Sequence, residues 1–443
     1  MYVRHIWVRL LTRPCIMICA FICGGACAGP VAGSLDPSFG RGGIVVTQAP
    51  LAIEPTGALL QPDGKIVVIG ELRNTPQATM ALGVMRYFSD GSVDTSFGHG
   101  GQATTQITNF INYANAAALQ ADGKILIAGE AQSADGTLSE FAVVRFNRDG
   151  TLDRSFGHGG KVTTNFVGVR AGGVSNPANS ILVQADGKIL VGGSASFCPR
   201  NCGRRKAALA RYNGNGTPDL SFGSGGMVSV TAIGTASTLG EDASGNIFAL
   251  SGAQIAEFSP TGVLRPSGSI SAAHMAVTTP ANFQSNPAIF QPDGRYVVGA
   301  SAKGITRHDI DVQAWRYELT GLIDGRFNNP PFDFAEENAI TQDAAQAMAL
   351  HPNGQIVLGG IHQRTGAPGI PVFGLSRLNP DGTLDSTFGN GGVVTTQVPG
   401  FPNGAFIDAL LIQPDEKIVT LGIGLTSDTI NPPGLVLIRY LGQ

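Results

Sequence analysis

Side chains that could carry acid–base chemistry gather in the second half of the chain, in stretches of irregular sequence. His308 and Asp311 lie close together, and Glu336 and His362 follow in two later stretches. An imidazole and a carboxyl group that a fold brings together can act as base and acid in hydrolysis or elimination. If the protein is an enzyme, we expect these four residues to carry the reaction.

A basic stretch suggests a different function, the binding of an anion. Arg200, Arg204, Arg205 and Lys206 lie close together in a chain whose formal charge is −3. Guanidinium groups bind carboxylate, sulfate or phosphate groups through paired hydrogen bonds. These residues therefore form a candidate binding site, and the alternative is a solvated loop.

Cys198 and Cys202 lie in the same stretch. In an oxidising compartment, two cysteines this close together are expected to form a local disulfide, whereas a metal site would need two further ligands nearby. The stretch Phe156-Gly-His-Gly-Gly-Lys161 lacks the Ser or Thr that follows a phosphate-binding loop, and Asn147 to Asp153 lacks the closing Glu of a calcium loop. We therefore expect no metal and no cofactor.

Seven repeats of one short pattern must position any such site. The repeats are marked by a turn residue at Gly64, Gly123, Gly187, Gly245, Gly294, Gly354 and Glu416. Between these turns the chain consists of short β-branched runs, and 61 of its 443 residues are Gly. Self-similarity at such a period indicates a stacked or circular array, and four short runs in each unit are typical of a propeller blade.

Two features of the repeat predict local structure. Most units place Asp or Asn before the turn glycine, as in Asp63-Gly64, which is the signal for a two-residue hairpin with positive φ at both central residues. Phenylalanines recur in register within Phe-Gly-x-Gly-Gly or its variants, and we expect a hydrophobic plug beneath each blade at Phe39, Phe97, Phe156, Phe222, Phe327 and Phe388.

The two ends of the repeat region are incomplete units that complement each other. Residues 35–48 supply one outer strand, and the last unit ends after its third strand, at Arg439 and Tyr440. An open array would leave two unpaired edges that invite aggregation. We therefore expect an all-β fold, a seven-bladed β-propeller of four-stranded blades, closed by pairing of the N-terminal strand with the three C-terminal strands.

Oppositely charged residues recur eight positions apart, and the fourth unit exchanges their signs, with Glu257 at the arginine position and Arg265 at the aspartate position. Two charge changes at paired positions are explained by contact, and guanidinium and carboxylate groups suit such pairs. Asp36 and Arg439 complete the set across the two termini. The expected structural ion pairs are Arg86–Asp94, Arg145–Asp153, Arg211–Asp219, Glu257–Arg265, Arg316–Asp324, Arg377–Asp385 and Arg439–Asp36.

The stretches Arg145 to Gly160 and Gln61 to Ile66 resemble the bacterial delta-60 repeat, a β-propeller family of uncharacterised function. The resemblance covers nearly the whole chain after residue 28, but Gly245 to Gly268 and Phe327 to Pro330 depart from the pattern. The resemblance implies a β-propeller fold in an exported bacterial protein. It implies no reaction and no functional residues.

The first 28 residues differ from the repeats. Three arginines precede an apolar run, and Ala26-Cys27-Ala28 ends the segment. This order is typical of a secretory signal peptide cleaved after residue 28, and the apolar run is too short to span a bilayer. We expect a periplasmic or extracellular protein with one propeller domain over 29–443 and no transmembrane segment, and the alternative is a lipid anchor at Cys27.

The net charge and the lengths of the loops limit the functions that the protein can have. Removal of three Arg and no acid with the signal peptide changes the formal charge from −3 to −6, which disfavours nucleic acid as a partner. Loops of irregular length lie on one predicted face of the propeller, and such loops on a rigid scaffold commonly form binding surfaces. We expect a monomeric binding or interaction module for a glycan or protein. The alternatives are a propeller lyase or hydrolase with an acid–base site at the channel mouth, and a purely structural surface protein.

Overall fold

The computed structural model describes residues 31–47, 53–74, 79–166, 175–196, 205–252, 254–265, 287–303, 310–328, 330–334, 341–364, 369–426 and 434–443. Residues 31–443 form one compact unit. Several predictions fall outside the described residues, namely those on the signal peptide (1–28), Cys198, Cys202, Arg200, Arg204, His308 and Glu336.

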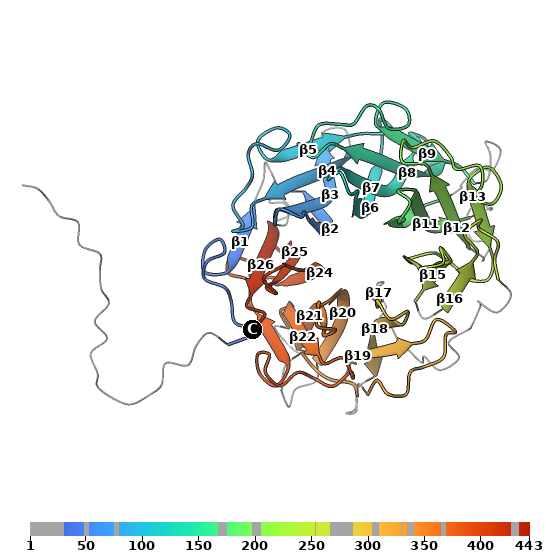
Figure 1. Cartoon of the computed structure of the whole chain (residues 1–443). Helices are drawn as coiled ribbons and strands as arrows, with labels where there is room; N and C mark the ends of the chain where they lie inside the picture. Colours follow the sequence, from blue (N-terminus) through green and yellow to red (C-terminus); the bar gives the residue numbers. More distant parts are fainter. Residues whose placement is uncertain are drawn as a thin grey trace, which may run out of the picture. The chain divides into compact units, whose positions relative to one another are not determined.

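Seven blades of antiparallel strands surround a common axis (Figure 1). Blades 1 to 3 have four strands each, numbered from the inside outward. These strands are β2 (Glu54–Leu60), β3 (Ile66–Asn74), β4 (Thr79–Tyr87) and β5 (Gln102–Thr105); β6 (Asn112–Leu119), β7 (Ile125–Gln132), β8 (Ser139–Phe146) and β9 (Lys161–Thr164); and β10 (Ala178–Val183), β11 (Ile189–Ala195), β12 (Lys206–Tyr212) and β13 (Met227–Val230).

Blades 4 and 5 are described by three strands each, and a bridge between Val312 and Phe332 takes the place of the fourth strand in blade 5. Blades 6 and 7 have four strands, and one parallel pairing, Ile310 with Gln342, joins the third strand of blade 5 to the first strand of blade 6 in a single seven-stranded sheet. The strands are β14 (Thr238–Glu241), β15 (Ile247–Ser251) and β16 (Gln254–Phe258); β17 (Ala288–Phe290), β18 (Tyr296–Lys303) and β19 (Ile310–Tyr317); β20 (Thr341–Leu350), β21 (Ile356–Arg364), β22 (Val372–Leu378) and β23 (Val393–Thr396); and β24 (Ala405–Ile412), β25 (Ile418–Gly424), β26 (Gly434–Tyr440) and β1 (Ile44–Thr47).

The N-terminal strand completes blade 7. β1 pairs antiparallel with β26, with Ile44 opposite Ile438. The innermost strands contact one another in the cyclic order β2, β6, β10, β14, β17, β20 and β24, and β24 contacts β2. The predicted seven-bladed, closed β-propeller is therefore confirmed.

The turns between first and second strands differ from the predicted two-residue hairpin. Gly64 has a φ of 80°, whereas Glu416 is the only residue other than glycine with positive φ among those described. Asp63 therefore keeps a negative φ, and its carboxylate accepts a hydrogen bond from the Lys65 N–H at 3.4 Å. The prediction is wrong because this side-chain bond favours a type I turn followed by one left-handed residue.

The repeated phenylalanines are buried between neighbouring blades. Phe39, for example, has no solvent exposure, and even Phe327, the most exposed of the six, is only 8% exposed. Phe39 packs against the turn of blade 1, where Gly91 has a φ of 85° and an added Cβ would lie 2.8 Å from the aromatic ring. A glycine is required at this position, since both the backbone conformation and the close approach exclude a side chain.

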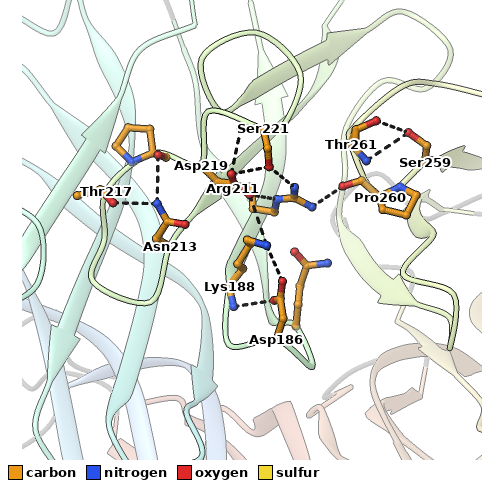
Figure 2. A network of polar contacts seen from close by, with 12 residues as sticks. Asp186, Lys188, Arg211, Asn213, Thr217, Asp219, Ser221, Ser259, Pro260 and Thr261 are labelled. Atoms are coloured by element: carbon orange, nitrogen blue, oxygen red, sulfur yellow. Dashed lines mark hydrogen bonds and ion pairs between the residues drawn. The ribbon is translucent and has the colours of Figure 1, made fainter.

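In each of six blades, one arginine lies against the repeated phenylalanine and donates a hydrogen bond to a backbone carbonyl of the next blade. We call each such unit an arginine latch. Figure 2 shows the latch of Arg211, whose Nε donates to Asp219 Oδ2 at 2.8 Å and whose Nη1 donates to Pro260 O of blade 4 at 2.6 Å. The guanidinium also lies 4.5 Å from the centroid of the Phe222 ring. The other five latches are centred on Arg86, Arg145, Arg316, Arg377 and Arg439.

The structure brings together all seven predicted ion pairs, but the pair of blade 4 has a different environment. Arg265 lies 2.9 Å from Glu257, and the two side chains are 45% and 20% exposed. Arg265 Nη2 also donates to Asn246 Oδ1 at 2.7 Å, within the same blade. Because an ionised Glu257 cannot donate a hydrogen bond to a carbonyl of blade 5, it cannot replace the latch arginine between these two blades.

Arg439→Gln should lower the free energy of unfolding by about 3 kcal/mol, because the buried Asp36 keeps only Lys417 as a charged partner, at 3.2 Å, and blade 7 loses its bond to blade 1. Arg265→Gln is the matched control, and it should cost less than about 1 kcal/mol because its pair is partly exposed. Urea denaturation followed by fluorescence measures both variants. Equal losses would contradict a special role of the buried latch.

Backbone amides of β16 should exchange faster than those of β12. The Arg211 latch holds blade 3 against blade 4, whereas Glu257 makes no such bond to blade 5 among the residues that the structure describes. Weaker tertiary contacts permit local opening. Hydrogen exchange followed by mass spectrometry on the intact protein compares the two strands directly. Equal protection would show that the latches do not determine local stability.

Candidate functional site

Five innermost strands carry a β-bulge at corresponding places. The register of each shifts by one residue against the second strand of its blade. β-Bulges change the direction of a side chain and often occur beside active sites. The extra residue is polar in every case, and we call the set the bulge residues: Thr56, Asn115, Asn179, Gln346 and Asp408.

Three bulge residues, Asn179, Gln346 and Asp408, line one cavity of about 850 Å³. They come from blades 3, 6 and 7, so this cavity lies in the central channel. Arg205 and Gly234 also line it, and they belong to connections between second and third strands or between blades. The cavity therefore lies at the irregular face, and its volume suits a small molecule.

Asp408 is the one acid among the described residues that line this cavity. Its Oδ2 atom is buried and has no hydrogen-bond partner in the described part of the chain. Burial raises the pKa of Asp408 to about 8, because removing a carboxylate from water disfavours its charged form. The carboxyl group is therefore mostly protonated at neutral pH and can donate a proton.

Neutral polar groups complete the polar part of the lining. Asn179 Nδ2 donates to Thr235 Oγ1 at 3.1 Å, and both residues face the cavity. Gln346 Oε1 is buried without a hydrogen-bond partner among the described residues, which leaves an acceptor for a ligand hydroxyl. Asn115, by contrast, donates to Ala178 O at 2.8 Å and connects blade 2 to blade 3.

The predicted basic site is described only in part. Arg205 is exposed and lines the cavity, where it is the one basic side chain among the described residues. Lys206 begins β12, is half-buried and does not belong to the cavity lining. The structure therefore places one of the two described basic residues in the channel.

The two described members of the predicted acid–base group lie outside the cavity lining. Asp311 is buried in β19. His362 Nδ1 lies 2.8 Å from Asp343 Oδ1, and Asp343 Oδ2 accepts a hydrogen bond from the Phe334 N–H at 2.7 Å. Burial raises the pKa of Asp343, although the contact with His362 lowers it in part. This buried pair connects β20 to β21, and it gives His362 a structural role.

The bulge residues were not predicted, although the sequence contains a periodic signal for them. Asn179 precedes Gly187 by eight residues, and Asp408 precedes Glu416 by the same interval. Each bulge residue interrupts a run of small or apolar residues at this fixed distance from the turn. The interval could have located the set, but it could not have shown that Asp408 differs in burial.

Among the described residues, no group of three or more His, Cys, Asp or Glu side chains is placed to hold a metal ion. No helix within the described ranges is long and apolar enough to cross a membrane.

Four segments of the chain match a family model described as "Domain of unknown function (DUF5122) beta-propeller". The matched residues are 61–97, 120–156, 184–222 and 351–388. The chain is thus similar to a β-propeller repeat family, and the more specific delta-60 name stays a prediction. No curated protein sequence matches the chain.

Solved structures with a similar arrangement include three enzymes. The α-L-arabinanase of Penicillium chrysogenum is 11% identical, with 92% of this chain and 97% of that chain covered and a TM-score of 0.42. The α-L-arabinofuranosidase of Fusarium graminearum is 11% identical, with coverage of 93% and 98% and a TM-score of 0.42. The periplasmic gluconolactonase of Pseudomonas aeruginosa is 14% identical, with coverage of 80% and 92% and a TM-score of 0.41. Identity and TM-scores at this level carry no information on the activity of this chain.

Asp408→Asn should stabilise the protein near pH 8 and have little effect near pH 4. In the unfolded chain the carboxyl group ionises near its ordinary pKa of 3.8, whereas in the folded protein it holds its proton up to about 8. Wild-type stability therefore falls as pH rises between these values. We expect the free energy of unfolding of the variant to exceed that of the wild type by about 2 kcal/mol at the higher pH, allowing for partial contact with solvent. Urea denaturation at both pH values measures it, and a pH-independent difference would contradict the raised pKa.

Proposed function

We propose that the channel cavity is the functional site and that the protein is a hydrolase or lyase acting on a hydroxyl-rich small molecule. The supporting observation is the carboxyl group of Asp408, which is buried without a hydrogen-bond partner among the described residues and lies in a cavity with amide and hydroxyl side chains. Burial raises its pKa to about 8. A strongly shifted pKa in a cleft marks a candidate functional group. An acid whose pKa lies near the working pH is also an effective proton donor.

In this proposal Asp408 protonates the leaving oxygen as its bond to carbon breaks. In hydrolysis, water adds to that carbon and returns a proton to the Asp408 carboxylate. In elimination, the carboxylate recovers its proton from the neighbouring carbon. Asn179 and Gln346 bind hydroxyl groups of the substrate, and the predicted signal peptide would place the reaction in the periplasm or outside the cell.

A binding module without turnover is the second candidate function. Asp408 is the one carboxyl group in the described cavity lining, whereas most glycoside hydrolases use two. This observation favours binding of a glycan without cleavage. A cavity of about 850 Å³ suits a small ligand better than a folded protein partner.

A panel of glycosides, esters and acidic polysaccharides, tested with the intact protein, separates these functions. Asp408→Asn should reduce kcat/KM by about 100-fold or more and retain ligand binding, and wild-type turnover should fall as pH rises above about 8. Asp122→Asn is the matched control, because Asp122 is 56% exposed in a turn between strands. Full activity of the Asp408 variant would refute its role, and binding without any turnover would support the second function.

A further inference from the structure

We infer that the ligand of the channel cavity carries a carboxylate group, as sugar acids do. Arg205 binds this carboxylate, and the hydroxyl-bearing part of the ligand lies against Asp408. The inference rests on the proposed function for the location of the site, but it does not require turnover.

The cavity contains one basic and one acidic side chain among its described lining residues, Arg205 and Asp408. Because burial raises the pKa of Asp408 to about 8, only Arg205 is fully charged at neutral pH. The cavity is therefore positively charged inside a chain whose formal charge is −3. A local field of this sign attracts an anion in preference to a neutral ligand.

Arg205 differs from the latch arginines in its surroundings. The latch arginines are buried and lie 2.7 to 2.9 Å from a carboxylate. Arg205 is exposed, and within the described ranges its side chain has no ion pair or hydrogen bond. A guanidinium that faces a cavity in this way can bind a carboxylate through two parallel hydrogen bonds.

Arg205 and Asp408 come from blades that face each other across the channel. Arg205 precedes β12 of blade 3, and Asp408 lies in β24 of blade 7, so two blades separate them on one side and three on the other (Figure 1). The two side chains therefore line different sides of the cavity. A ligand that contacts both must hold its anionic group apart from the hydroxyl beside Asp408.

The rest of the lining suits the uncharged part of such a ligand. Gln346 Oε1 lacks a partner among the described residues, and this acceptor fits a hydroxyl and not a second carboxylate. Met348 and Leu410 add apolar surface for the C–H face of a sugar ring. The lining thus offers one site for an anion and separate sites for hydroxyl groups.

Calorimetric titration of the intact protein with galacturonate and its dimer, against galactose and its neutral dimer, tests the inference. Galacturonate and galactose differ only by a carboxylate in place of a hydroxymethyl group. We expect the acidic sugars to bind at least about tenfold more tightly. Arg205→Gln should abolish this preference and leave neutral sugars unaffected, while Arg154→Gln, at an exposed position of another turn, should change neither.

Equal affinity for acidic and neutral sugars, absence of binding, or a preference that survives Arg205→Gln would overturn the inference. Binding of galactose phosphates without galacturonate would also overturn it. The two proposals fail separately: Asp408-dependent turnover of neutral sugars alone would uphold the function and refute the carboxylate. Arg205-dependent binding without Asp408-dependent turnover would uphold the carboxylate and refute the proposed catalytic function. Unchanged circular dichroism of the variants excludes misfolding as the cause.

Discussion

The fold depends on a guanidinium group that makes three contacts at once. Arg211 pairs with the carboxylate of its own blade, lies on the ring of Phe222 and donates to the carbonyl of Pro260 in the next blade. Hydrophobic contact between two blades is not directional, so it does not by itself set their relative rotation. The latch supplies this direction, because a hydrogen bond and a fork-shaped ion pair both require a defined geometry. The same contact recurs in six blades, so the same directional constraint acts at six boundaries between blades.

The latches also explain why so few charged groups are available for chemistry. Most arginines and aspartates of the repeat are buried in pairs, as in Arg145–Asp153, and removal of either partner is costly. Asp408 and Arg205 are exceptions that the structure does not need for closure. A carboxyl group without a partner in a partly desolvated site lowers stability when ionised, and a rigid ring can tolerate that cost. The charged groups that stabilise the fold lie between blades, whereas the ionisable groups of the candidate site lie in the channel.

The features that follow from repetition could be predicted from the sequence, and those that depend on pairing register or burial could not. The contact between Asp36 and Arg439 followed from an interval seen in five other units, and the exchanged charges of Glu257 and Arg265 pointed to a contact. A bulge is one extra residue in one strand, so its position depends on how that strand pairs with its neighbour. The protonation of Asp408 depends on side chains from several blades, and no local pattern records this. His362 was a candidate from its type alone, and its partner Asp343 is visible only in the fold.

Blade 4 departs from the repeated latch and also contributes residues to the lining of the candidate site. It keeps charge complementarity through Glu257 and Arg265, yet in the described part of the chain this pair makes no bond to the next blade of the kind that the latches make. The connection that leads into this blade, Gly234 to Thr238, forms part of the cavity wall, and Pro287 at the start of blade 5 forms another part. Local departures from an otherwise consistent pattern are expected at functional sites. The preserved pair argues against random decay of the unit, because decay would not exchange both charges. Within the described ranges, the boundary that lacks a latch therefore borders the cavity, where adjustment to a ligand would not break a latch.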